Sequence, residues 1–404
     1  MNLKKGISFT VFMMASFPVT GYFTFKASFF VLLILSAINF FRNKEWPPKL
    51  PLFVVLSYFS IDFLSSIVVL STIESSEILI RKSMFFLLPL TIYFVSNHMD
   101  KKTINRILLI FICSTATLSL YVLINLFLMD FSELLNKNSF YHPVFRNNYF
   151  DLTKIYFPYL GLYFAFSFVS TIHFMIWATK GRYIKLFTLV SATFIFLFPM
   201  LLFSPRAAFL ALVFGLAFYV FNISRMKKAI VIITLLSIIF IFVIPNPLKE
   251  RFEKLTNTEW ILPSQEQAPH EVNYRYGVYH CAFQSLKTKF PFGYGLGNVQ
   301  DQLEECYSSY SYNSFNSFTE QHYNSHNQFL HEILKNGLLG LISICLLFYI
   351  SFVRAKLVHQ TLLIMCIIAL LTENFFEREA GIVFFTFFNS IFIFRSKKTP
   401  IKWI

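Results

Sequence analysis

The chain has 404 residues, of which 56% are hydrophobic and 14% are charged, and its mean hydropathy is +0.58. A soluble domain carries roughly 25% charged residues, so this composition excludes an ordinary water-soluble fold and indicates a protein that buries apolar blocks in a bilayer. The formal net charge is +14. Most basic residues stand between the apolar blocks, however, which is a topology signal and argues against a nucleic-acid partner.

The apolar blocks predict an all-α integral membrane protein with about 12 transmembrane helices. The first block resembles a signal peptide, but no small-x-small cleavage site follows it, so we expect an uncleaved helix. Several blocks are shorter than the ~20 residues that a straight span needs, so their ends must extend into polar flanks. In chain order the predicted spans are 7–23, 27–41, 52–71, 83–96, 107–128, 158–177, 186–203, 207–221, 229–244, 338–353, 357–371 and 381–394.

The spacing of the basic residues predicts the orientation of these spans. Lys and Arg gather in alternate loops, beginning with Lys4 and Lys5 and ending with the C-terminal tail, so the positive-inside rule places both termini in the cytoplasm. The chain then divides into residues 1–244 with spans one to nine, a large periplasmic loop over 245–336, and residues 337–404 with spans ten to twelve and a cytoplasmic tail. A shorter loop over 130–157 falls on the same outer side.

The large loop is rich in Tyr, Asn, Ser and Gln, a composition that suits sugars because it offers hydrogen bonds and apolar faces for stacking. Cys281 and Cys306 both lie in this loop. In an oxidising compartment they could pair, and two free thiols are an equal alternative. Within the third span, the acidic Asp62 has a functional role, pairs with a polar neighbour on a helix, or lies near a water-filled groove.

Three segments could carry chemistry. In Ser204-Pro205-Arg206 the serine is a good N-cap and the proline suits a first helical position, so a helix N-terminus and a guanidinium would form an anion site. The alternative is an arginine that reaches the lipid headgroups. Arg275 in the large loop is by default a solvated charge, and the glycine-rich stretch 291–297 is a turn rather than a nucleotide loop.

The third segment is 325–340. Ser325 and Gln328 fit a capping box, so we expect His326 in the first turn of a helix, where it could act as a general base or as a structural hydrogen-bonding residue. His331 lies about 140° further around such a helix, so a zinc pair is not expected.

The order of these segments resembles the O-antigen ligase and O-antigen polymerase family. That family shares a His-Asn, nine residues, then Gly-x-x-Gly, and this chain has His326-Asn327, nine residues, Gly337 and Gly340. Ser204-Pro205-Arg206 is similar to the family's Ser-Arg helix start with a proline inserted, and Arg275 corresponds to its loop arginine. The segments Tyr159–Tyr163, preceded by Phe-Pro rather than His-Pro, and 377–381, which contains Arg378, also resemble relatives.

The resemblance implies a glycosyltransferase of the bacterial inner membrane that works without metal or cofactor. Its expected partners are a glycan donor on undecaprenyl diphosphate, a lipid A core or glycan acceptor, and membrane lipids. Catalytic roles would fall to His326, Arg206 and Arg275, and substrate binding to Ser204, Asn327 and Arg378. The two arginines would stabilise the diphosphate, and His326 would serve as base or as a diphosphate ligand.

Two alternatives to a ligase remain at this point. A polymerase uses the same donor chemistry and differs only in its acceptor. A polysaccharide-lipid flippase would also have many helices, but transporters often show internal repeats and broken helices, which this sequence does not display. A large polar loop with Arg and His near its ends favours an enzyme.

Overall fold

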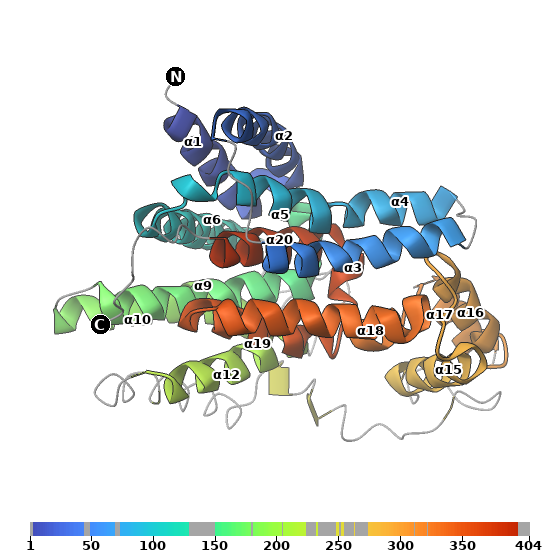
Figure 1. Cartoon of the computed structure of the whole chain (residues 1–404). Helices are drawn as coiled ribbons and strands as arrows, with labels where there is room; N and C mark the ends of the chain where they lie inside the picture. The colour runs from blue at the N-terminus through green and yellow to red at the C-terminus, as the bar shows by residue number, and fades with distance from the viewer. Residues whose placement is uncertain are drawn as a thin grey trace.

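The computed structural model describes residues 3–43, 49–68, 73–128, 150–178, 181–203, 205–223, 232, 248–249, 252–253, 262, 274–310, 312–320 and 322–394. All regular secondary structure in these ranges is helical, as the composition predicts. The longer helices lie side by side in layers, and a group of short helices sits at one end of the bundle (Figure 1).

Helices of the first half of the bundle cover predicted spans one to six, and α4 is an additional helix where the sequence predicted a loop. The covered segments are apolar and contain good helix formers. The boundaries differ most between the first two helices, where α1 ends at Ala15 and not at residue 23, and α2 begins at Phe17 and not at residue 27. Gly21 has a φ of +80° and turns the chain between the first two spans. The helices are α1 (Leu3–Ala15), α2 (Phe17–Asn43), α3 (Lys49–Val68), α4 (Ile73–Lys82), α5 (Met84–Phe94), α6 (Lys101–Leu128) and α9 (Phe157–Trp177).

The second half of the bundle continues this pattern. Predicted span seven comprises α10, a π-helical turn and α11, and the next spans pack against α9 and against one another. Apart from Ile232, predicted span nine lies outside the described residues. The helices are α10 (Arg182–Ala192), η2 (Thr193–Leu197), α11 (Phe198–Phe203), α12 (Arg206–Phe221), α18 (Gln328–Arg354), α19 (Leu357–Leu370) and α20 (Glu379–Ile393).

Five described helices are long and apolar enough to cross a membrane, and four shorter ones are apolar, so the predicted count of about twelve spans stays a prediction. Many large apolar side chains on these helices point outward, among them Phe23 at 85% exposure and Phe187 at 73%. Exposed apolar surface of this extent is typical of a protein whose solvent is lipid. The five helices are Phe17–Arg42, Lys101–Leu126, Phe157–Trp177, Arg182–Phe203 and Gln328–Arg354.

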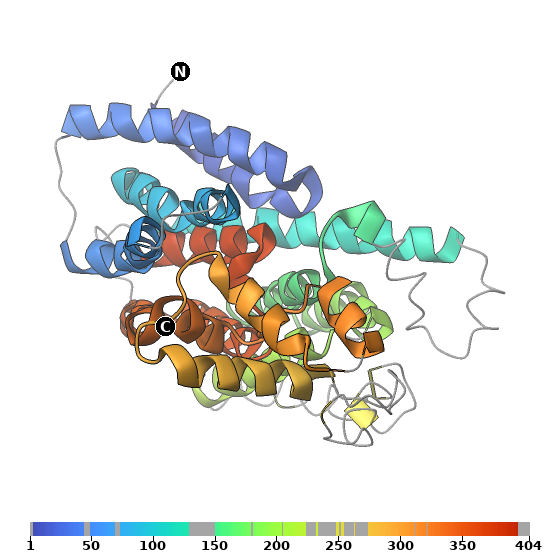
Figure 2. The ribbon, with the colours of Figure 1, turned by 90° about the vertical axis from the view of Figure 1, so that its right-hand side faces the viewer.

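The described part of the large loop forms a helical cap of α15 (Tyr274–Lys289), α16 (Asn298–Tyr307) and α17 (Tyr312–Glu320). The cap lies beside the N-terminal end of α18 (Figures 1 and 2). It has its own small core, which includes Leu330 and Leu334 of α18. A disulfide joins Cys281 to Cys306 and so ties α15 to α16, which settles the pairing that the sequence left open.

Helix α18 begins at Gln328, nine residues before the predicted segment 337–404. It therefore joins the end of the predicted loop to predicted span ten, with Gly337 at the junction. Gly337 has a φ of +61° and kinks α18. Leu338 N–H donates to the Pro291 carbonyl at 2.9 Å, and a Cβ on Gly337 would overlap that same oxygen. Only glycine allows both the positive φ and the close approach of the Pro291 carbonyl. At this residue of the motif, the turn 291–297 packs against α18.

Candidate active site

The predicted site residue His326 lies just before α18 and not in its first turn. The expected capping box is wrong: Asn327 is the N-cap, and its side chain accepts from Leu330 N–H at 3.1 Å. His326 instead adopts a left-handed conformation with φ +45°, which is costly for a residue with a Cβ and persists only where its surroundings impose it. Here the Asn324 side chain accepts from His326 N–H at 3.1 Å.

Glu373 joins His326 to Arg275. Its Oε2 lies 3.2 Å from His326 Nδ1, and its Oε1 accepts from Arg275 Nη2 at 3.0 Å. All three side chains are partly buried, with His326 and Glu373 each 22% exposed. Two residues from motifs far apart in the sequence therefore meet at one carboxylate that the sequence reasoning did not single out.

The contact with Glu373 favours one tautomer of His326. An ionised carboxylate only accepts hydrogen bonds, so a neutral imidazole paired with it carries its proton on Nδ1 and keeps a lone pair on Nε2. Nε2 has no protein hydrogen bond among the described residues. This is the arrangement of a general base that is oriented by a partly buried carboxylate.

The loop between α19 and α20 is held against the start of α18 by amide side chains. Asn374 exchanges hydrogen bonds with the Ser325 hydroxyl at 3.2 and 3.3 Å, and Phe376 N–H donates to Gln328 Oε1 at 2.8 Å. Ser325 and Gln328, predicted to cap a helix, thus anchor the loop that carries Glu373. From the cap side, Tyr279 donates to the His326 carbonyl at 3.5 Å, and burial raises the pKa of Tyr279 so that its hydroxyl stays protonated.

A buried ionic cluster lies beneath this loop, where α3, α4, α18 and η4 (Phe375–Glu377) meet. Its carboxylates belong to Asp62, Glu332 and Glu377, and its ammonium groups to Lys82 and Lys335. Lys335 Nζ lies 2.8 Å from Asp62, and Lys82 Nζ lies 2.5 Å from Glu377. Asp62 is therefore paired with polar neighbours, which is one of the alternatives that the sequence left open.

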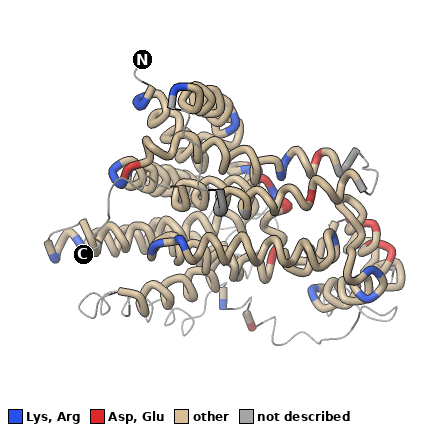
Figure 3. Tube along the Cα trace, in the orientation of Figure 1, with Lys and Arg blue, Asp and Glu red and all other residues tan. Residues whose placement is uncertain are grey.

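Glu377 stays ionised in this cluster. Burial alone would raise its pKa, but the neighbouring ammonium groups of Lys82 and Lys335 outweigh burial and hold the pKa well below its usual range. Figure 3 shows charges of both signs in this region, whereas the middle of most helices carries none. Buried charges are retained where they are paired in this way.

The other predicted site residues lie around the same end of the bundle. Arg206 is half-buried at the first position of α12, and Pro205 occupies the N-cap one residue before its expected place. Ser204 lies outside the described residues. Arg378 follows η4, and its guanidinium carbon lies 5.5 Å from the centre of the Tyr156 ring.

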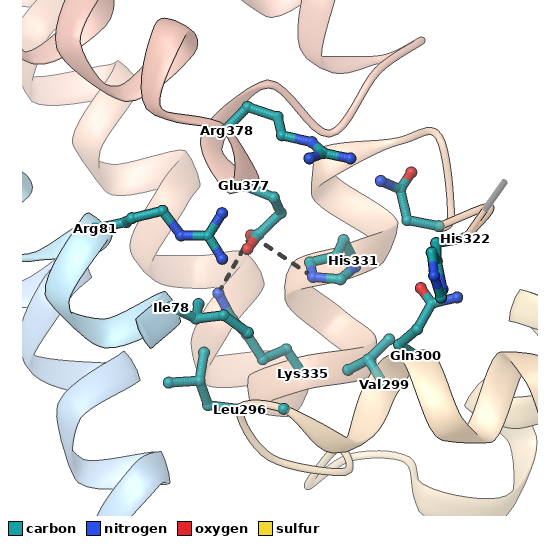
Figure 4. A pocket seen from close by; sticks show the side chains of 12 residues that line it. Ile78, Arg81, Leu296, Val299, Gln300, His322, His331, Lys335, Glu377 and Arg378 are labelled. Carbon is teal, nitrogen blue, oxygen red and sulfur yellow. Dashed lines mark ion pairs between the residues drawn. The ribbon is translucent and has the colours of Figure 1, made fainter. Parts of the chain in front are cut away.

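A pocket of about 310 Å³ opens beside Arg378 (Figure 4). Arg81, His331, Lys335 and Glu377 also line it, whereas Arg206, Arg275 and His326 do not. The structure therefore brings His326 and Arg275 together at Glu373 and gives Arg378 a second, adjoining site. Glu373 and Glu377 were visible in the sequence as acids in a short loop between two spans, but nothing there indicated which residues they meet.

The described residues contain one group of potential metal ligands, His280, Cys281 and Cys306. The two sulfur atoms are joined in the disulfide, so neither is the thiolate that a metal would require. The group therefore contributes to the structure of the cap.

The sequence model of the O-antigen ligase family matches residues 191–345. The matched segment contains Arg206, Arg275, His326 and Asn327 and ends before Glu373 and Arg378. No curated protein matches this chain.

Proposed function

We propose that this chain, whose residues 191–345 match the sequence model of the O-antigen ligase family, transfers a glycan from undecaprenyl diphosphate to an acceptor hydroxyl. The reaction takes place at the outer face of the bacterial inner membrane. The acceptor is a lipid A core or a similar saccharide, which makes the protein a ligase.

The contact of Glu373 with both His326 and Arg275 carries this proposal. His326 Nε2 takes the proton of the acceptor hydroxyl as its oxygen attacks the anomeric carbon of the donor sugar. The bond from that carbon to the diphosphate oxygen breaks, and the carrier diphosphate leaves with the electron pair. A base held in one tautomer is suited to this step because it needs no reorganisation during the reaction.

The leaving diphosphate gains negative charge, which the guanidinium groups of Arg206 and Arg275 stabilise in this proposal. Arg275 donates from Nη2 to Glu373, and the planar fork of a guanidinium matches the oxygens of a phosphate. Arg206 adds its charge to the N-terminus of α12, which favours anions. Ser204 and Asn327 assist binding at the two helix starts, and the chemistry requires no metal.

The position of the site supports access for both substrates. The helices are apolar on their outer faces, so the carrier's lipid tail can reach the site from within the bilayer. The cap with its disulfide lies over one end of the bundle, and disulfides persist in oxidising compartments. Both observations favour a periplasmic site with cytoplasmic termini.

The second candidate is a polymerase, for which the acceptor is another carrier-linked repeat unit. The donor chemistry at His326 is the same, and only the acceptor differs. A flippase is less favoured, because a transporter does not need a histidine oriented by a carboxylate at the membrane face.

A polysaccharide gel of a deletion strain, complemented with wild type or His326→Ala, tests the proposal. A ligase leaves carrier-linked polymer accumulating while the long surface ladder disappears, whereas a polymerase defect leaves single repeat units on the surface acceptor. We expect His326→Ala to behave as the deletion does. Full complementation by a membrane-inserted His326→Ala protein would refute the assignment of His326 as the catalytic base, and with it this mechanism.

A further inference from the structure

The pocket next to the His326 site is lined by more positive than negative charge. Arg81, Lys335 and Arg378 provide three cations and Glu377 provides one carboxylate. With both lining histidines counted as neutral, the wall of the pocket carries a net charge of +2. An electropositive concave site of this kind favours an anionic ligand.

The lysine and the carboxylate are already engaged in the buried cluster. Lys335 is within 3 Å of both Asp62 and Glu332, and the Glu377 carboxylate has Lys82 at 2.5 Å. The cluster's three carboxylates and two ammonium groups together carry one net negative charge. Arg81 and Arg378 add two positive charges, so the pocket and the cluster beneath it together carry a net charge of +1.

Arg81 and Arg378 form no ion pair with any carboxylate in the described part of the chain. They come from different elements, α4 and the loop after η4, and their side chains lie around Glu377 at the pocket (Figure 4). The guanidinium carbon of Arg378 also lies 5.5 Å from the centre of the Tyr156 ring, a cation–π contact that does not use its N–H donors for a carboxylate. Two guanidinium groups held in this way match the oxygens of a phosphoryl group.

Neutral polar side chains cover the opposite wall. Gln300 at the cap and Asn324 line the pocket with His322, and such groups hydrogen-bond sugar hydroxyls. Asn324 also accepts from the backbone N–H of His326. A saccharide bound here would therefore lie next to the residue that we propose as the base.

We propose that this pocket binds a phosphoryl group carried by the acceptor saccharide, through Arg81 and Arg378. The inference rests on the proposed function and specifies the class of acceptor. The acceptor is favoured over the donor diphosphate because much of the lining, at Leu296–Gln300 and His322–Asn324, belongs to the cap and its connection to α18. Arg206 and Arg275, which we assign to the donor, do not line the pocket.

Steady-state transfer by the purified protein in detergent tests the pocket. The substrates are a carrier-linked donor and a phosphorylated acceptor oligosaccharide. The same acceptor, dephosphorylated with a phosphatase, serves as the comparison. A lost charge-assisted contact costs about 1.5–3 kcal/mol, so Arg81→Gln or Arg378→Gln should raise the KM of the phosphorylated acceptor about 10- to 100-fold. The donor KM should stay within about twofold. Arg→Lys variants should recover part of the loss.

The dephosphorylated acceptor should have the same KM in wild type and in both Gln variants. Arg182→Gln is the matched control, because Arg182 is an exposed arginine at the start of α10, far from the pocket. A rise in the donor KM with an unchanged acceptor KM would assign the pocket to the donor diphosphate and overturn the proposal. Unchanged KM values for both substrates would overturn it too.

Binding of glucosamine 6-phosphate against glucosamine, measured by ligand-observed NMR without donor, separates this inference from the proposed function. The inference is supported, even if no transfer is detected, when wild type binds glucosamine 6-phosphate more tightly than glucosamine and both Arg81→Gln and Arg378→Gln abolish this preference. Equal binding of both sugars by wild type refutes it even if the protein is an active ligase. Size-exclusion profiles identical to wild type show that the variants remain folded.

Discussion

Replacing Glu373 with glutamine tests how His326 is oriented. The carboxylate accepts from His326 Nδ1 at 3.2 Å and from Arg275 Nη2 at 3.0 Å. A glutamine of the same shape can donate its amide N–H to Nδ1, which moves the imidazole proton to Nε2 and removes the lone pair that the acceptor hydroxyl needs. The change alters one atom type and leaves the packing in place.

The expected loss follows from what a positioned base contributes. General base catalysis typically accounts for about 10²–10⁴ in rate, and each factor of ten corresponds to about 1.4 kcal/mol of activation free energy. Glu373→Gln should therefore lower kcat about 10²- to 10⁴-fold, or about 3–5 kcal/mol in the barrier. The donor KM should change little, because Arg275 keeps its charge.

Single-turnover transfer from a fluorescent carrier-linked donor in detergent measures this loss directly. Glu373→Asp retains an ionised carboxylate and should recover part of the rate. Glu305→Gln is the matched control, because Glu305 is exposed on α16 and its carboxylate accepts from the neighbouring Gln302 side chain. If Glu373→Gln keeps kcat within about threefold of wild type while His326→Ala is inactive, Glu373 does not position the base.

Three further predictions concern the framework of the site. Gly337→Ala should lower the free energy of unfolding by about 1–3 kcal/mol or more, because the alanine would combine a positive φ with overlap on the Pro291 carbonyl. Thermal unfolding in detergent measures this loss. Gly21→Ala is the control and should have a smaller effect, because its φ is also positive but no atom lies within 4 Å of the added Cβ. Cys281→Ser should lower the free energy of unfolding by about 2–4 kcal/mol, because it removes the disulfide between α15 and α16. Limited proteolysis should then cut the cap faster. Equal proteolysis of the reduced and the oxidised wild type would contradict this. Lys335→Met leaves one ammonium group with three buried carboxylates and should lower the free energy of unfolding by about 3–5 kcal/mol. Asp62→Asn leaves two ammonium groups with two carboxylates and should lower it less. A melting temperature that is lower for Asp62→Asn than for Lys335→Met would refute the charge argument.

The sequence by itself determined the class of the protein and the order of its motifs. Apolar blocks separated by basic loops specify membrane helices because backbone hydrogen bonds and side-chain hydrophobicity are local properties. The described helices begin and end close to the predicted spans for the same reason. The spacing from His326 to Gly337 was also readable, and the kink at Gly337 gives it a physical basis.

Only the tertiary structure decided which charges meet. Glu373 lies 47 residues from His326 and 98 from Arg275, and Lys82 lies 295 residues from Glu377. No local pattern encodes such pairs, because each depends on how helices distant in sequence pack against one another. The same packing places Arg81 and Arg378 beside Glu377 at one pocket, without an ion pair to any carboxylate of the described residues. The buried acids pair with Lys82 and Lys335 instead, because a buried carboxylate is costly unless a cation compensates it.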